Sequence, residues 1–333
     1  MRRLLEYTQQ LVSPKLHLHS YLMMKKTLLA CVATGLVLSA IPTQAELPVS
    51  RRAGILPVSQ STGAVSLVSV PYTIEPDRFD VASVSGSTVT TASSVGTYTN
   101  PIARIVGGTD DGAIFSVSSA SGTSVVLGDA PASDTLAVEI YEQWTLDTLF
   151  ANGGSFSGAA AFGGGDILGL VNSSGTDFDL FYYNTTNSEW RTVAEVAAGG
   201  TIVPHNQGIL VLPASADPVV VSGVARSGDQ TPTYPLGQVS VVNYPFGTAF
   251  SFADLDVSQI NGAAAFGGGD IFLVPNAGGT DFDQFYYNTT SGEFRTSAEA
   301  PVVASAITFA AGETFAIIPA SNLSYNFEEG FAE

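Results

Sequence analysis

Residues 158–195 read GAAAFGGGDILGLVNSSGTDFDLFYYNTTNSEWRTVAE, and residues 262–299 read GAAAFGGGDIFLVPNAGGTDFDQFYYNTTSGEFRTSAE. Aligned without gaps, 27 of the 38 positions are identical, so the two stretches are copies of one sequence. Their starts lie 104 residues apart, which is the length of a domain, whereas solenoid repeats are roughly 20–50 residues long. The sequence therefore predicts two related modules in tandem.

Both copies are predicted to consist of β-strands. Short runs of aromatic and β-branched residues are separated by Asn, Gly, Ser and Asp turns, and no sustained helical period is present. In the first copy the expected strands cover residues 166–171, 178–183, 189–193, 208–213 and 218–224. In the second copy they cover residues 270–274, 282–287, 293–296 and 314–319. The predicted fold class is all-β, with two related antiparallel β-modules.

The residues before the repeats have a different pattern. Short apolar stretches, among them 63–72, 101–106 and 137–141, are separated by Gly-Ser and Asp-Gly turns, which is typical of a small N-terminal β-barrel or sandwich. We therefore expect the N-terminal β domain over residues 46–142, the first module over 143–228 and the second over 229–333.

The first 45 residues resemble an export signal. A basic segment (MMKK, residues 23–26) precedes a 14-residue apolar run and a small-residue cleavage site that ends at Ala45, which predicts a signal peptide over residues 23–45. The run is shorter than the ~20 residues of a transmembrane helix, and no second spanning stretch follows. Residues 1–22 are interpreted as an upstream extension, with Met23 or Met24 as the expected start of translation. The protein is therefore expected to be periplasmic, cell-surface or extracellular.

Removal of the signal changes the composition. The whole chain has a net charge of -18, whereas residues 46–333 carry seven arginines against 29 acidic residues and contain no lysine and no cysteine. This excludes thiol and Schiff-base chemistry and a Cys-rich zinc site. The acidity argues against nucleic acid as a partner, because phosphate binding needs clustered Lys and Arg. The only histidine of the mature chain, His205, is expected to be a solvent-exposed turn residue.

Several short motifs resemble an uncharacterised family of exported all-β proteins from verrucomicrobial and planctomycetal bacteria. The motifs are EQWTLDTLF (residues 142–150), followed by Asp166-Ile167, Tyr182-Tyr183-Asn184, Trp190-Arg191 and the Pro204–Gly208 turn. The second copy differs by having Phe294 in place of Trp190. The family has no assigned activity, so the resemblance implies export and architecture but supplies no catalytic residue.

The repeated carboxylates are candidate ligands of a hard cation. Gly-rich loops and D-x-D spacing can supply oxygen ligands to calcium. The candidates are Asp166, Asp177 and Asp179, with Asp270, Asp281 and Asp283 in the second copy. The alternative is that these acids cap turns or lie on a solvated face, and nothing in the sequence indicates that any of them is buried. No cofactor is expected other than this possible calcium.

The repeated aromatic residues have two interpretations. As exposed rings they would stack on sugars or anchor a partner. In alternating strands, rings more often fill the core and pair across strands. The residues concerned are Tyr182, Tyr183 and Trp190, with Tyr286, Tyr287 and Phe294 in the second copy. Arg191 and Arg295, beside these rings, are expected to pair with neighbouring carboxylates.

Three functions remain open from the sequence. The first is a non-catalytic protein of the cell envelope or extracellular space, structural or adhesive in role, because repetition of a module gives multivalency without new chemistry. The second is carbohydrate or ligand binding by the β-modules. The third is a hydrolase that uses carboxylates. The expected partners are surface polysaccharide or envelope proteins.

The predicted cleavage can be tested directly. We expect fractionation of the source cells to place the protein outside the cytoplasm, and mass spectrometry of its N-terminus to show Glu46 as the first residue. A mature protein that begins before Met23 would contradict the signal-peptide assignment.

Overall fold

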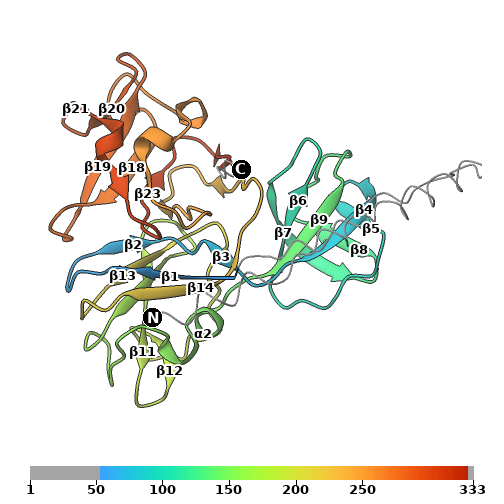
Figure 1. Cartoon of the computed structure of the whole chain (residues 1–333), viewed down its shortest axis with the longest axis horizontal. Helices are drawn as coiled ribbons and strands as arrows, with labels where there is room; N and C mark the ends of the chain where they lie inside the picture. The colour runs from blue at the N-terminus through green and yellow to red at the C-terminus, as the bar shows by residue number, and fades with distance from the viewer. Residues whose placement is uncertain (1–52, 329–333) are drawn as a thin grey trace, which may run out of the picture. The chain divides into compact units, whose positions relative to one another are not determined.

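The computed structural model of the chain describes residues 53–328 (Figure 1). Nearly all regular structure is β, with one four-residue α-helix and four short 3-10 helices, which confirms the predicted all-β class. In this range no helix has the length and apolar character needed to cross a membrane. The predicted signal peptide lies outside the described residues.

Residues 77–142 form a closed six-stranded barrel. In barrel order the strands are β4 (Asp77–Ser85), β5 (Thr88–Thr91), β8 (Ser124–Leu127), β7 (Ile114–Ser121), β6 (Pro101–Val106) and β9 (Ala137–Glu142). Burial alternates along β5 and β8, so one face of each strand lines the barrel interior. Small and branched side chains, including Val89, Ile105, Val125 and Ile140, fill that interior.

The three strands that precede the barrel in sequence belong to the first module. They are β1 (Ala53–Val58), β2 (Ser66–Val68) and β3 (Tyr72–Thr73). β1 and β3 both pair with β14 (Val219–Ala225), and β2 pairs with β13 (Ile209–Leu212). The expected domain boundary at 46–142 is corrected accordingly, because strands pair with partners far away in sequence that local patterns do not identify.

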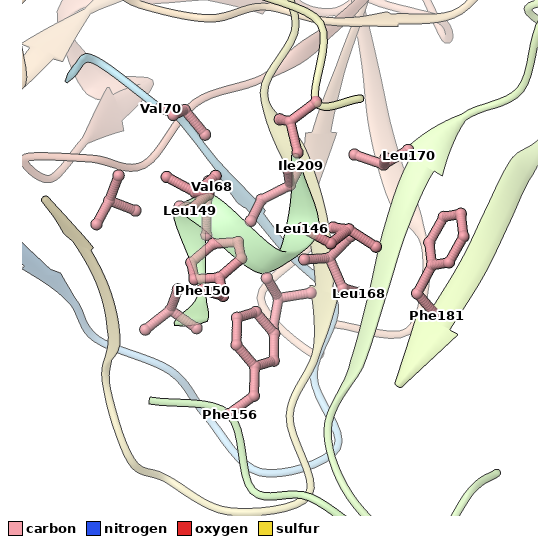
Figure 2. Close-up of a cluster of buried hydrophobic side chains, with 14 of the residues drawn as sticks. Val68, Val70, Leu146, Leu149, Phe150, Phe156, Leu168, Leu170, Phe181 and Ile209 are labelled. Atoms are coloured by element: carbon pink, nitrogen blue, oxygen red, sulfur yellow. The ribbon is translucent and has the colours of Figure 1, made fainter. Parts of the chain in front are cut away.

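The first module is a sandwich of two sheets. One sheet has the order β12–β11–β10–β13–β2 and the other β1–β14–β3. The remaining elements are β10 (Ile167–Val171), β11 (Phe178–Asn184), β12 (Glu189–Thr192), α2 (Leu146–Leu149) and the 3-10 helix η1 (Ala151–Gly153). Both sheets contribute to one core, into which α2 places Leu146 and Leu149 beside Phe150 and Phe156 (Figure 2).

The second module repeats the larger sheet. Its order is β16–β23–β18–β19–β20–β21, and two short pairs, β15–β24 and β17–β22, complete it. The strands are β15 (Thr233–Tyr234), β16 (Ser240–Val241), β17 (Phe250–Ser251), β18 (Ile271–Pro275), β19 (Phe282–Asn288), β20 (Glu293–Thr296), β21 (Pro301–Val302), β22 (Thr308–Phe309), β23 (Ala316–Ile318) and β24 (Leu323–Ser324). The 3-10 helices are η2 (Phe252–Asp254), η3 (Val257–Gln259) and η4 (Ala304–Ala306). Its core is rich in phenylalanine, with Phe252 packed against Phe272, Phe294 and Phe315.

Strand register shows that the duplication extends beyond the repeated sequence. β2 pairs with β13 through Leu67 and Leu210, and β16 pairs with β23 in the same way through Val241 and Ala316. Residues 66–72 (SLVSVPY) therefore occupy in the first module the place of residues 240–246 (SVVNYPF) in the second. It follows that the first module begins before the barrel, and that the barrel is an insertion into it.

The two modules contact each other through reciprocal backbone hydrogen bonds. Val65 N donates to Gly279 O at 2.7 Å, and the equivalent Val239 N donates to Gly175 O at 2.8 Å. Both glycines have positive φ, 62° and 66°, and a Cβ on Gly279 would lie 2.1 Å from the Cβ of Ala64. Only glycine can adopt the positive φ and also leave room for the close approach of Ala64. The contact therefore has approximate two-fold symmetry within one chain.

A shared apolar cluster lies at this contact. Leu67 and Leu210 of the first module meet Val241 and Ala316 of the second, and all four are buried. The same pair of positions from each module contributes, as in a self-complementary dimer interface. We therefore expect the stability of each module to depend on its neighbour.

Truncation of this cluster should destabilise the whole pair of modules. We expect Leu67→Ala to lower the free energy of unfolding of the mature chain by about 2–4 kcal/mol, because it leaves a cavity in a packed core. Val241→Ala should act in the same direction, and the double variant should be non-additive because the two side chains share one cluster. The measurement is urea unfolding. The control is Leu236→Ala, since Leu236 is 58% exposed; equal effects of the L67A and L236A variants would contradict the shared core.

Candidate functional site

The first repeated carboxylate of each copy is buried, and its acceptor oxygens bind backbone amides. Asp166, just before β10, accepts from Ser157 N and Ala214 N, both at 2.6 Å. Asp270, before β18, accepts from Asn261 N at 2.8 Å and Ala320 N at 2.7 Å. Each carboxylate thus joins two loops to the start of a strand. The interpretation that these acids lie on a solvated face is corrected for this pair, which is buried and whose amide partners compensate for the lost hydration.

The other repeated acids lie at the far end of the same hairpins. Asp177 and Asp179 are exposed, as are Asp281 and Asp283. Since Asp179 pairs with Leu170 near the end of β10, and Asp166 precedes its start, roughly 15 Å of strand separates Asp166 from the D-x-D pair at about 3.3 Å per residue. One calcium ion cannot bind all three, because its ligands lie within 2.3–2.6 Å of the ion. Among residues 53–328 no group of three or more acidic, His or Cys side chains could hold a metal.

The repeated aromatic residues are buried or half-buried, on both faces of the two large sheets. Tyr182, Trp190, Tyr286 and Phe294 are all at most 2% exposed, so the surface-stacking interpretation does not fit these four rings. Tyr183 and Tyr287 are half-buried and pack edge-on against Trp190 and Phe294, with ring centroids 5.9 and 5.5 Å apart. Alternation along β11 and β19 places Tyr183 and Tyr287 on the core side with Trp190 and Phe294. Tyr182 and Tyr286 lie on the opposite face, where Phe162 and Phe266 of the Gly-rich loops pack against them.

The buried tyrosine of each copy is hydrogen-bonded to a glutamate that the sequence interpretation did not single out. Tyr182 OH donates to Glu195 Oε2 and accepts from Asn184 Nδ2 at 2.9 Å; Tyr286, Glu299 and Asn288 repeat the arrangement. Both glutamates have positive φ, 61° and 63°. They also accept from the backbone of the Gly-rich loop, at Phe162 N and Phe266 N. The exact recurrence of Tyr and Glu thirteen residues apart is the signal that could have identified them.

Arg191 and Arg295 pair with neighbouring acids, in line with the sequence-based expectation. Arg191 Nη2 lies 2.6 Å from Glu189 Oε1, and Arg295 Nη2 lies 2.7 Å from Glu293 Oε1. The hydrogen bond from Arg191 lowers the pKa of Glu189, and that from Arg295 lowers the pKa of Glu293. These arginines therefore belong to the outer face of the sheet rather than to a binding site.

His205 lies in a turn, as expected, but it is not a free surface residue. Its ring packs against Tyr141 at 5.3 Å, and although part of the residue remains exposed, Nε2 is buried without a hydrogen-bond partner among residues 53–328. Burial, with nearby Arg226 adding to it, lowers the pKa of His205 well below its usual value. The ring is therefore neutral at neutral pH. The exposed-turn expectation is corrected, because the ring covers a barrel residue distant in sequence.

Around His205, polar side chains join the barrel to the modules. Arg104 of β6 pairs with Glu139 at 3.0 Å and donates Nε to Asp229 O at 2.9 Å. Arg226 donates to Val70 O and to His205 O. Tyr141 OH donates to Glu139 at 2.6 Å. The bond from Arg104 to Asp229 crosses from the barrel to the residues that link the modules, and we assign the whole cluster a structural role.

A cleft of about 250 Å³ opens on the second module. Its lining combines rings with acidic and amide groups, and contains no basic residue: Tyr244, Phe246, Phe250, Asp254, Leu255, Asp256, Gln259, Tyr325, Asn326, Phe327 and Glu328. These residues follow the β16 strand or belong to the closing β-strand region, outside the near-identical repeat. The aromatic and acidic run at 244–256 (YPFGTAFSFADLD) is the only sequence signal that could have marked it.

Two rings of the cleft stand perpendicular to Tyr244, and a third stacks on it. Tyr244 stacks on Phe250 with centroids 4.1 Å apart and meets Phe246 and Phe327 edge-on, at interplanar angles of 89° and 88°. Asp256 accepts from Ser258 N and Gln259 Nε2, both at 2.9 Å. These hydrogen bonds lower the pKa of Asp256, so it stays ionised at neutral pH.

Comparison with known proteins gives no relative from which to carry over a role. A scan against family models, a search of curated proteins and a search of solved structures each found no match to the chain. The assignment of sites therefore depends on the geometry described above.

The Tyr–Glu pairs should make stability depend on pH. Because the tyrosine hydrogen bond lowers the pKa of Glu195 and Glu299 below the ordinary 4.5, their stabilisation is complete above about pH 5 and is lost as the pH falls through the folded-state pKa. We expect the double variant Glu195→Gln, Glu299→Gln to have a lower Tm than the native chain near neutral pH. This difference should shrink as the pH falls below 4.5 and the glutamates of the native chain become protonated.

The measurement is thermal unfolding followed by circular dichroism across this pH range. Tyr182→Phe should reproduce part of the loss, because it removes the donor of the same bond. Asp179→Asn is the matched charge control on an exposed position. A Tm difference that persists unchanged at acidic pH would contradict the assigned role of the two glutamates.

Proposed function

We propose that the protein is an exported, non-catalytic protein of the cell envelope or the extracellular space, with a structural or adhesive role. The use of the repeated carboxylates carries this proposal. Asp166 and Asp270 bind backbone amides, and Glu195 and Glu299 bind tyrosine hydroxyls. Groups committed in this way to the scaffold are poor general acids or nucleophiles, because chemistry would require breaking the contacts that hold the loops.

The exposed acids do not form a catalytic pair with those buried ones. Asp177 and Asp179 stand on the solvent face at the far end of the β10–β11 hairpin from Asp166. A glycosidase needs two carboxyl groups roughly 5–10 Å apart on either side of the scissile bond. The strand length between them therefore argues for a non-catalytic role of the repeats.

The paired modules suit a load-bearing or adhesive role. Reciprocal hydrogen bonds and a shared apolar cluster hold the modules together, so surfaces on both are presented in a fixed relation. Such a unit can engage a partner at two places at once and gain from effective concentration. Surface polysaccharide and envelope proteins are the partners that we propose for this role.

The test is a comparison of source cells with and without the protein. We expect it in the envelope or medium fraction, and we expect cells that lack it to attach more weakly to surfaces or to one another. The native chain should restore attachment. A variant with Asp177, Asp179, Asp281 and Asp283 all replaced by Asn should restore it equally, since these acids have no catalytic part.

The hydrolase alternative predicts a different outcome. If the purified mature chain releases reducing ends from envelope polysaccharide and the quadruple Asn variant does not, the non-catalytic proposal is wrong. A cytoplasmic location of the protein would equally contradict it.

A further inference from the structure

The residues that line the cleft differ from their equivalents in the first module. The place of Phe246 is taken in the first module by Tyr72, whose strand β3 pairs with β14, and Trp144, which precedes α2, donates Nε1 to Tyr72 O at 3.1 Å. In the second module the equivalent Phe246 lines the cleft together with Tyr244.

The shape of the aromatic wall distinguishes between ligands. A sugar ring is recognised on one broad flat ring face, with donors and acceptors at its edge. Here Phe246 and Phe327 stand perpendicular to Tyr244, so the rings form adjoining walls rather than one platform. Rings around a rounded cationic group are the arrangement that recognises quaternary ammonium ions.

The charge of the lining points in the same direction. Asp254, Asp256 and Glu328 are exposed at the cleft, and no Lys, Arg or His lines it. Asp254 and Asp256 already accept hydrogen bonds from neighbouring serines, so their hydrogen-bonding capacity is partly used while their charge remains. These three carboxylates form the acidic rim of the cleft. The rim attracts a cation, and it repels carboxylate, phosphate and sulfate groups.

From this combination we propose that the cleft binds a small organic cation with a quaternary ammonium head, with Tyr244, Phe246 and Phe327 contacting the head and the acidic rim balancing its charge. The volume of about 250 Å³ accommodates a choline-sized molecule. A zwitterion with a carboxylate close to the ammonium group should bind more weakly, because the rim repels it. This inference concerns the second module alone and does not depend on the adhesive role proposed above.

The first experiment is calorimetric titration of the mature chain with choline and tetramethylammonium. The matched control is 3,3-dimethylbutan-1-ol, which has the shape of choline without its charge. We expect both cations to bind at one site and the neutral alcohol to bind at least about tenfold more weakly. Binding should weaken at high salt, because the rim charges are exposed. Equal binding of the alcohol, or tighter binding of glucose or N-acetylglucosamine, would overturn the proposal.

Variants locate the site. Tyr244→Leu should weaken choline binding about tenfold, whereas Tyr244→Phe, which keeps the ring, should change it by less than about threefold. Glu328→Gln should weaken binding about threefold, while Glu75→Gln, which removes the same charge from an exposed position outside the cleft, should not. Circular dichroism and Tm establish that each variant is folded. Unchanged affinity in a folded Tyr244→Leu protein would contradict the site.

A chain that ends at Glu328 tests whether the C-terminal residues 329–333, rather than a ligand, occupy the cleft. We expect it to bind choline as the full mature chain does. If only the shortened chain binds, the cleft is a docking place for residues 329–333 and the proposal of a ligand site in the native protein fails.

Discussion

The edges of the two large sheets impose the constraint on which the module pair depends. β2 and β16 are the terminal strands of their sheets, and an open edge exposes backbone donors and acceptors that invite pairing with other chains. Here backbone groups of each edge strand are hydrogen-bonded by the other module. Thr314 N donates to Leu67 O at 3.1 Å, and the equivalent Gly208 N donates to Val241 O at 2.9 Å. One symmetric contact therefore protects both edges and also buries the apolar cluster between them.

The duplicated scaffold allows the two copies to differ at one place. Between β3 and α2 the first module carries the whole barrel, whereas the second has only a short link between Phe246 and Phe250. After this difference the two modules are equivalent again at the start of the next helix, because Thr145 before α2 and Ser251 before η2 each take part in a capping box. The insertion thus enters at a loop and leaves the packing on either side unchanged, as expected where loops tolerate length better than strands do.

Local patterns predicted the strands well and their partners poorly. Alternation gave the β10–β12 and β18–β20 hairpins, because register in a hairpin is set by neighbouring residues. The same reasoning placed residues 63–72 in the barrel, since nothing local indicates that Leu67 pairs with Leu210. Burial of Asp166 and the packing of His205 against Tyr141 depend on residues brought together only by folding. The cleft was missed for the same reason, since its lining comes from segments about 80 residues apart in the chain.

Identity between the copies marked the scaffold rather than the site. The residues that recur without change, such as Asp166 and Asp270 or Tyr182 and Tyr286, are those whose side chains hold loops and cores that both modules need. A residue that contacts a ligand in the second module has no reason to recur in the first. Tyr244 corresponds to Val70, which lies in the first module's core. In a duplicated chain, positions of identity therefore report on folding, and the search for a binding site belongs where the copies have diverged.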